Sequence, residues 1–207
     1  MRTPALASLA AITLAAAAGA QTLPVKRTAA PQEIFSVGVD YANAAKSTTT
    51  GAGTFDSDGV AIKLRAAVSN AVFLQASFAD ISHKDTTITG STKDYSLGVG
   101  TRFAAGAGSV DLSYGFGKVD FAGTRYDQHT VRAAYELGLG NGVDVGLALT
   151  EFVNDKAVSA NVTAPEVSVG YRFGQGLSAR LSFSTENTLF GFAGGSSTVA
   201  IGVRYGF

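Results

Sequence analysis

The sequence predicts an all-β protein, a closed antiparallel up-and-down barrel of about ten strands. Three observations support this prediction. Apolar and polar residues alternate with a period of two from Ile34 to the end of the chain. Short glycine-containing turns alternate with longer polar links, which is the connection pattern of a meander. The last residues, IGVRYGF, still alternate, so the final strand can pair with the first and close the sheet.

The first 20 residues differ from the rest of the chain. Arg2 precedes the alanine-rich stretch ALASLAAITLAAAAGA, which ends in small residues. This layout is typical of a secretory signal peptide, here cleaved after Ala20. A membrane-anchoring helix is the alternative, but a stable helical span needs ~20 strongly apolar residues. We therefore expect a signal peptide over residues 1–20, a short periplasmic leader over 21–33 and the barrel over 34–207.

Each segment of the barrel region has one face that is cleanly apolar. In the second segment, for example, Val60, Ile62 and Leu64 oppose Lys63 and Arg65. Strands are expected around residues 35–41, 60–68, 72–78, 95–103, 110–116, 131–137, 143–149, 167–173, 177–183 and 199–207. Short turns are expected at 69–71, 104–108, 140–142 and 174–176, and longer links at 43–59, 80–93, 117–127, 152–164 and 185–197. An even strand number places both chain ends at the short-turn end, as in transmembrane barrels.

The residues on the two faces indicate which side meets lipid. A soluble sandwich or a lipocalin-like barrel would bury the apolar face and show the polar face to water. The polar faces here carry many glycines, including Gly38, Gly98, Gly115 and Gly170, which suit a narrow lumen better than a solvated strand surface. The apolar faces carry no acidic or basic residue, and a lipid-facing Arg or Lys costs about 2–4 kcal/mol at mid-depth. We therefore expect the apolar face outside, against lipid.

Aromatic residues gather near both ends of the apolar face. Toward the long links lie Tyr41, Phe78, Tyr95, Phe116 and Phe183, and toward the short turns lie Phe35, Phe103, Phe173, Tyr205 and Phe207. Two such rings are typical of the aromatic girdles at the two interfaces of a transmembrane barrel. The alternative explanation is the general preference of strands for aromatic residues.

On these residues, Ile34 to Phe207 resembles the small outer-membrane β-barrel proteins of Gram-negative bacteria, which include porin-family and opacity-like proteins. The end of the chain resembles the barrel-assembly signal of that group through Gly202, Tyr205 and Phe207, although Ala200 stands where a polar residue is usual. The resemblance implies a place in the outer membrane, contact with its lipid and lipopolysaccharide, and recognition of the last strand by the barrel-assembly machinery. Many members have eight strands, so eight remains an alternative to ten.

Charged residues on the inward faces gather near the short-turn end. They are Arg65, Arg102, Asp111, Glu136, Asp144, Arg172, Arg180 and Arg204, while Asp40, Lys63, Arg132 and Glu166 lie farther from that end. Such charges must be paired or hydrated inside a barrel. We expect an ion-pair network across the lumen. It can act as a salt-bridged plug, which we favour, or as the selectivity constriction of a water-filled pore.

Other chemistry has little support in the sequence. The 207 residues contain no cysteine, two histidines and no net charge, so we expect no cofactor, no metal site and no nucleic-acid partner. His83 is expected in the second long link, and His129 on the lipid face. The sequence favours an outer-membrane protein with a structural or surface-interaction role. A narrow porin-like diffusion channel is the alternative, and a lipid- or peptide-modifying enzyme at the rim is less favoured, so we expect no enzyme.

Overall fold

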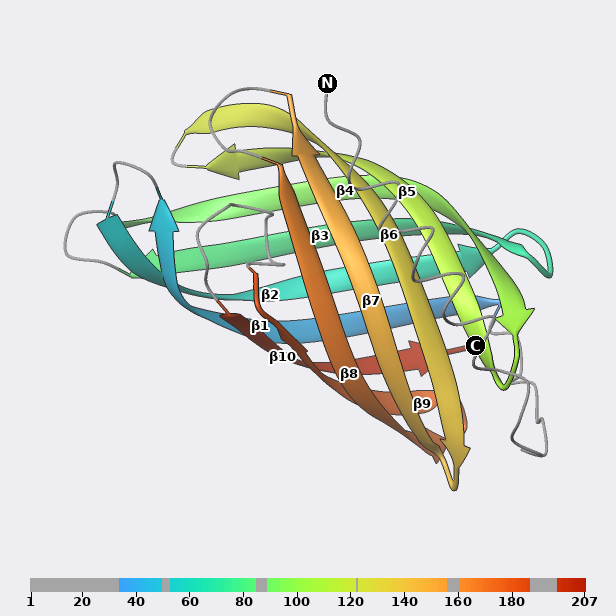
Figure 1. Cartoon of the computed structure of the whole chain (residues 1–207). Helices are drawn as coiled ribbons and strands as arrows, with labels where there is room; N and C mark the ends of the chain where they lie inside the picture. Colours follow the sequence, from blue (N-terminus) through green and yellow to red (C-terminus); the bar gives the residue numbers. More distant parts are fainter. Residues whose placement is uncertain (1–33, 50–52, 85–88, 122, 156–160, 187–196) are drawn as a thin grey trace.

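The computed structural model describes residues 34–49, 53–84, 89–121, 123–155, 161–186 and 197–207, which form one closed barrel of ten antiparallel strands (Figure 1). The strands are β1 (Phe35–Thr49), β2 (Gly53–Ala67), β3 (Val72–Lys84), β4 (Thr89–Ala105), β5 (Gly108–Phe121), β6 (Thr124–Gly140), β7 (Val143–Asn154), β8 (Val162–Gly174), β9 (Leu177–Ser184) and β10 (Ser197–Gly206). The predicted ten-strand barrel is confirmed, and the eight-strand alternative is wrong. The predicted signal peptide and leader lie outside the described residues.

Each strand pairs with its neighbours in the chain, and β1 pairs with β10. The last residue takes part in this closure, because the Phe207 amide donates to the Phe35 carbonyl at 2.8 Å. Following the strand register from Tyr41 through β2 to β5 leads to Arg125 on β6. Following it the other way, through β10 to β7, leads to Leu137, 12 residues farther along the same strand. This stagger fixes the tilt of the strands, which brings residues from distant strands to one level of the lumen.

The short turns have the backbone conformations that their sequences favour. We call the end of the barrel that carries them the inner end, and the opposite end the outer end. Asn141 and Gln175 have φ of 52° and 50°, and the glycine after each also has positive φ. Positive φ at both central residues defines the tight hairpin turn whose twist matches that of the strands, and Asn-Gly favours it. The four predicted short turns therefore connect β2 to β3, β4 to β5, β6 to β7 and β8 to β9.

The predicted long links at the outer end are mostly strand. Residues 43–59 contribute the ends of β1 and β2, 80–93 extend β3 and β4, and 117–127 extend β5 and β6. Most of the last predicted link, 185–197, lies outside the described residues. The expectation of loops was wrong for a physical reason. Beyond the apolar band the sequence no longer alternates cleanly, yet ladder hydrogen bonds still hold the backbone in strands.

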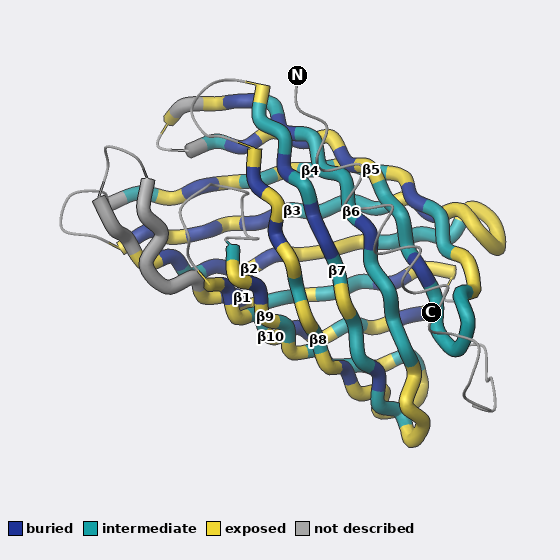
Figure 2. Tube along the Cα trace, in the orientation of Figure 1, coloured by how far each residue is buried: buried dark blue, intermediate teal, exposed yellow. Residues whose placement is uncertain are grey.

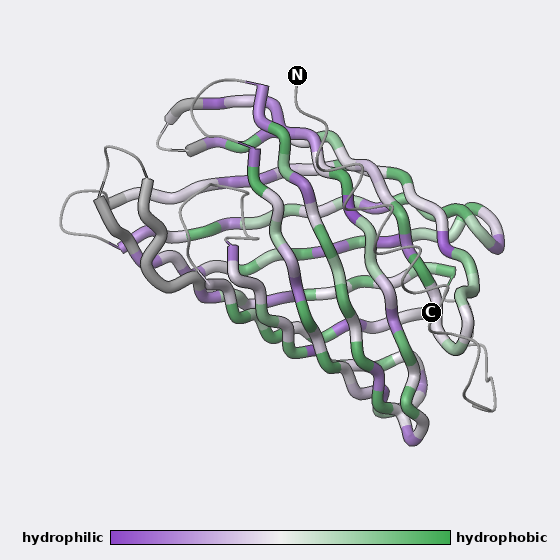
Figure 3. The backbone as a smooth tube through the Cα atoms, viewed as in Figure 1, coloured by the Kyte–Doolittle hydropathy of each residue, from purple (hydrophilic) through white to green (hydrophobic). Residues whose placement is uncertain are grey.

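The outer face of the barrel is apolar, as predicted. Leu97, Leu147 and Ile201 point outward with 70%, 55% and 58% of their surface exposed. Burial and hydropathy alternate along the strands, as Figures 2 and 3 show. In the described part of the chain, no helix is long and apolar enough to cross a membrane.

Near the outer end of the lumen, the inward faces of β2, β3, β5 and β6 form a small packed core. Ala61, Ala79, Ile81, Val119 and Tyr126 contact one another there, and we call them the apolar cluster. Ile81 and Val119 have no exposed surface. This core was not predicted, because its members lie at or beyond the ends of the predicted strands. The inner part of the lumen, by contrast, is lined by charged side chains.

Candidate functional site in the barrel lumen

The first part of the charged site is built on β2, β4 and β5. Arg102 and Asp111 are direct partners in the β4–β5 register, and the arginine Nε lies 2.6 Å from Asp111 Oδ1. Arg65 reaches Asp111 from β2, with Nη1 at 2.7 Å from Oδ2. Between them stands β3, whose inward Phe73 lies under the Arg65 guanidinium at 3.4 Å from carbon to ring centroid. One carboxylate thus holds two arginines from strands on either side of an aromatic ring.

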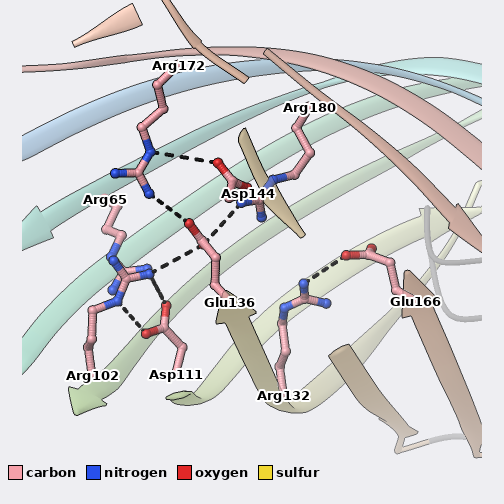
Figure 4. A network of polar contacts seen from close by, with 9 residues as sticks. All are labelled: Arg65, Arg102, Asp111, Arg132, Glu136, Asp144, Glu166, Arg172 and Arg180. Carbon is pink, nitrogen blue, oxygen red and sulfur yellow. Dashed lines mark hydrogen bonds and ion pairs between the residues drawn. The ribbon is translucent and has the colours of Figure 1, made fainter. Parts of the chain in front are cut away.

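The second part is built on β6 to β9 (Figure 4). One Nη2 atom of Arg180 lies 3.0 Å from both Glu136 and Asp144. Arg172 contacts the same two carboxylates, at 3.0 Å from Glu136 and 3.7 Å from Asp144. Arg102 lies 4.0 Å from Glu136 and joins the two parts. Together these seven residues form what we call the inner network.

Two further ion pairs lie farther toward the outer end. Lys63 Nζ approaches Asp40 at 2.5 Å, and Arg132 lies 3.0 Å from Glu166. Arg132 also donates to Thr150 Oγ1 at 3.0 Å. Here each cation has one acid, so this level of the lumen is balanced in charge.

The predicted lumen residues all come from inward-facing positions. Seven of the eight near the short turns meet in the inner network, and Arg204 faces inward from β10, opposite Gly38 of β1 and Ser178 of β9. Of the predicted assembly signal, Gly202 lies opposite Asp40 in the β1–β10 register, and the rings of Tyr205 and Phe207 pack edge to face with centroids 4.7 Å apart. The alternation along each strand predicted which residues face inward, but it did not predict that Phe73 stacks against Arg65.

The basic and acidic side chains of the inner network differ in their exposure to the lumen. Arg102, Arg172 and Arg180 keep 36%, 43% and 39% of their side-chain surface exposed, whereas Asp144 keeps 6%. Asp111 and Glu136 are also mostly covered. These three arginines are therefore the more exposed members of the inner network, and the carboxylates are the more covered ones. Water reaches these side chains, so the network does not seal every space around it.

The structure corrects the expected place of His83. It lies on β3 rather than in a link, faces inward and is 3% exposed. Its Nδ1 is 2.9 Å from Ser57 Oγ, and its Nε2 is 2.6 Å from Thr92 Oγ1. The residue lies five positions beyond Phe78 of the outer aromatic ring, outside the apolar band. Burial there lowers the pKa of His83 and favours the neutral imidazole.

A Ser–His pair at hydrogen-bond distance raises the question of nucleophilic catalysis. Ser57 has no exposed surface, and the two imidazole nitrogens contact the hydroxyl groups of Ser57 and Thr92. A buried hydroxyl cannot reach a substrate, so we interpret the three residues as a polar cluster that holds β2, β3 and β4 together. His129 faces outward, as expected, and its Nδ1 lies 2.6 Å from the Tyr114 hydroxyl.

Among the residues that the structure describes, no group of three His, Asp or Glu side chains is placed to hold a metal ion. A scan against protein-family models and a search of curated proteins gave no match.

Several solved barrels share the fold. An outer membrane channel from Pseudomonas putida F1 superposes with a TM-score of 0.53 and 12% identity, over 90% of this chain and 100% of that one. The translocator domain of the autotransporter NalP from Neisseria meningitidis gives 0.47 and 12%, over 98% and 96%. The KdgM porin gives 0.46 and 10%, over 82% and 99%. With its apolar outer face and charged lumen, the chain has the fold of an outer-membrane β-barrel protein.

Proposed function

We propose that this barrel spans the outer membrane of a Gram-negative bacterium with its apolar face against lipid. What supports the proposal is the apolar outer face, which carries no charged residue between the two aromatic rings, together with the fold shared with an outer membrane channel. Beyond the outer ring, the outward side chains become charged and paired. Examples are Lys84 with Asp58 at 3.0 Å and Lys118 with Asp127 at 3.1 Å. This charged belt suits contact with lipopolysaccharide headgroups.

Within the membrane, we propose that the protein is a narrow diffusion channel for small polar solutes. The observation that carries this proposal is the exposure of inward-facing charged side chains far from the inner mouth. Lys63 faces the lumen and keeps 62% of its side chain exposed, which requires room for water beside it. A lumen filled by ion pairs would leave such a group covered.

A structural or surface-interaction role is the second candidate. It is favoured by the apolar cluster and the Ser57–His83–Thr92 group, which fill part of the lumen near the outer end. We propose no enzymatic role, because the Ser–His pair in the described part of the chain is enclosed.

Conductance of the purified, refolded barrel in a planar lipid bilayer distinguishes the two candidates. A channel gives discrete, small and reproducible current steps. A correctly folded barrel, recognised by heat-modifiable migration on a detergent gel, that gives no steps would exclude the channel and leave the structural role.

A further inference from the structure

We infer that the inner end of the lumen selects small anions over cations. This inference rests on the proposed channel and names the class of solute that it favours. It depends on how charge is distributed in the inner network, not on the presence of charge alone.

The inner end of the lumen carries an excess of positive charge. Four arginines of the inner network, Arg65, Arg102, Arg172 and Arg180, face inward there with three carboxylates, Asp111, Glu136 and Asp144. Four cations and three anions leave one net positive charge in the inner network. The next level outward, with Lys63–Asp40 and Arg132–Glu166, adds no net charge.

On the strands that the structure describes, one further acid faces inward, but it lies too far away to cancel this excess. Asp94 is eight residues from Arg102 along β4, which corresponds to roughly 25 Å of strand. At physiological salt, charges in water are screened over about 8 Å. Asp94 therefore adds little to the field of the inner network.

The arrangement of these groups strengthens the effect of the excess. Three of the four arginines are the more exposed members, and the carboxylates are the more covered ones, with only 6% of the Asp144 side chain exposed. A passing ion thus meets the donors of arginine first. Guanidinium groups bind carboxylate and phosphate oxygens with several N–H donors in one plane, so small organic acids and phosphate fit the site as well as chloride does.

Arg172 offers a clean way to lower the excess. Both of its partners, Glu136 and Asp144, are also bound by Arg180 at 3.0 Å. Arg172→Gln therefore removes one cation from the lumen and leaves neither carboxylate alone. The matched control is Arg125→Gln, which removes an exposed arginine 3.3 Å from Asp120 near the outer end of the barrel. Both variants change the total charge by the same amount.

The test is the reversal potential of single channels under a KCl gradient across a planar bilayer. We expect the reversal potential of the wild type to be shifted toward the equilibrium potential of chloride, which corresponds to a chloride-to-potassium permeability ratio above one. Arg172→Gln should lower that ratio by about twofold or more, whereas Arg125→Gln should leave it unchanged. Asp111→Asn, which raises the positive excess, should increase the ratio.

The outcomes separate the two proposals. A folded wild-type barrel without current steps overturns the channel itself. Steady current steps that show no preference, or a preference for potassium, leave the channel standing and overturn the anion selectivity. Equal effects of Arg172→Gln and Arg125→Gln on the permeability ratio would also overturn it, because a charge in the lumen would then influence selectivity no more than a charge on the outer surface.

Discussion

The guanidinium of Arg65 lies over the ring of Phe73 inside the barrel, with 3.4 Å between its central carbon and the ring centroid. Phe73 is buried although it belongs to the inward, mostly polar face of β3. Its ring fills the space that Arg65 crosses to reach Asp111. Gly100 of β4 lies against the ring, and an added Cβ at that position would overlap it. The ion pair of Arg65 therefore depends on a glycine two strands away.

Gly100→Ala should destabilise the barrel by about 1–3 kcal/mol, the usual cost of forcing an extra methyl group into a packed interior. The matched control is Gly38→Ala, another inward glycine, where the nearest atom to an added Cβ is 3.6 Å away. That control should be neutral or slightly stabilising. Urea unfolding in detergent micelles measures both changes. Equal stabilities of the two variants would show that Phe73 moves aside without cost.

Leu147 tests the assignment of the outer face to lipid. It points outward from β7 with 55% of its surface exposed. Leu147→Arg should lower the stability in lipid vesicles by about 2–4 kcal/mol, because a charge must enter the hydrocarbon. Asp80→Arg, on the outer face of β3 beyond Phe78, is the control and should cost about 0–1 kcal/mol. If both substitutions are tolerated equally in vesicles, the apolar face does not meet lipid.

The strand number and the two faces could be predicted from the sequence because the same physical demand acts on every strand. A charged residue is excluded from every outward position within the apolar band, and Thr101 is the one polar residue on the described strands there. Val60, Leu97, Leu147 and Ile201 therefore follow one pattern although they are far apart in the chain. The closure of β10 on β1 followed from the alternation that continues to Phe207.

The contacts inside the lumen could be predicted only in part. Parity places Arg180, Glu136 and Asp144 on inward faces, but which charges meet depends on the stagger of the strands, which no single strand encodes. His83 was misplaced because β3 continues beyond the apolar band, where polar residues on both faces conceal the period of two. The inward parity of Ile81 and His83, continued from Phe73, was the signal that could have revealed it.

Arg180 should matter more for stability than Arg172. Arg180 lies 3.0 Å from both Glu136 and Asp144, and Asp144 is the most covered acid of the inner network. Arg180→Gln leaves Asp144 only the longer contact of 3.7 Å to Arg172. Loss of a partner from a buried pair costs about 3–5 kcal/mol, and the partial exposure of Arg180 lowers our expectation to about 1–3 kcal/mol.

Arg172→Gln is the paired variant and should cost less than about 1 kcal/mol, since both carboxylates keep Arg180. Urea unfolding of the two variants side by side measures the difference. A larger loss for Arg172→Gln than for Arg180→Gln would contradict the contacts of the inner network.

Protonation of His83 should make the barrel less stable in mild acid. Burial lowers the pKa of its imidazole in the folded state, so the unfolded chain binds a proton more readily near pH 6. The stabilisation from neutral His83 is therefore complete above the unfolded pKa of 6.5 and is lost as the pH falls below it. The free energy of unfolding should drop more between pH 7.5 and 5.5 in the wild type than in His83→Gln. Between pH 7.5 and 8.5, the difference between the two proteins should stay constant, and a parallel drop in acid would contradict the prediction.

Phe207 tests whether the last strand is read during assembly. Its ring contacts Phe35 of β1 at a centroid distance of 6.0 Å, and its backbone pairs with that strand. If the residue serves mainly as a signal, Phe207→Ala should sharply lower the amount of folded barrel in cells. Refolding of the same purified variant in detergent should change little, because most of the Phe207 ring is exposed and contributes little packing. Phe173→Ala, at the inner end of β8 and exposed to a similar extent, 61% against 68% for Phe207, is the control and should fold normally in cells. Equal losses for both variants in cells and in detergent would show that these aromatic residues act through stability and not through recognition.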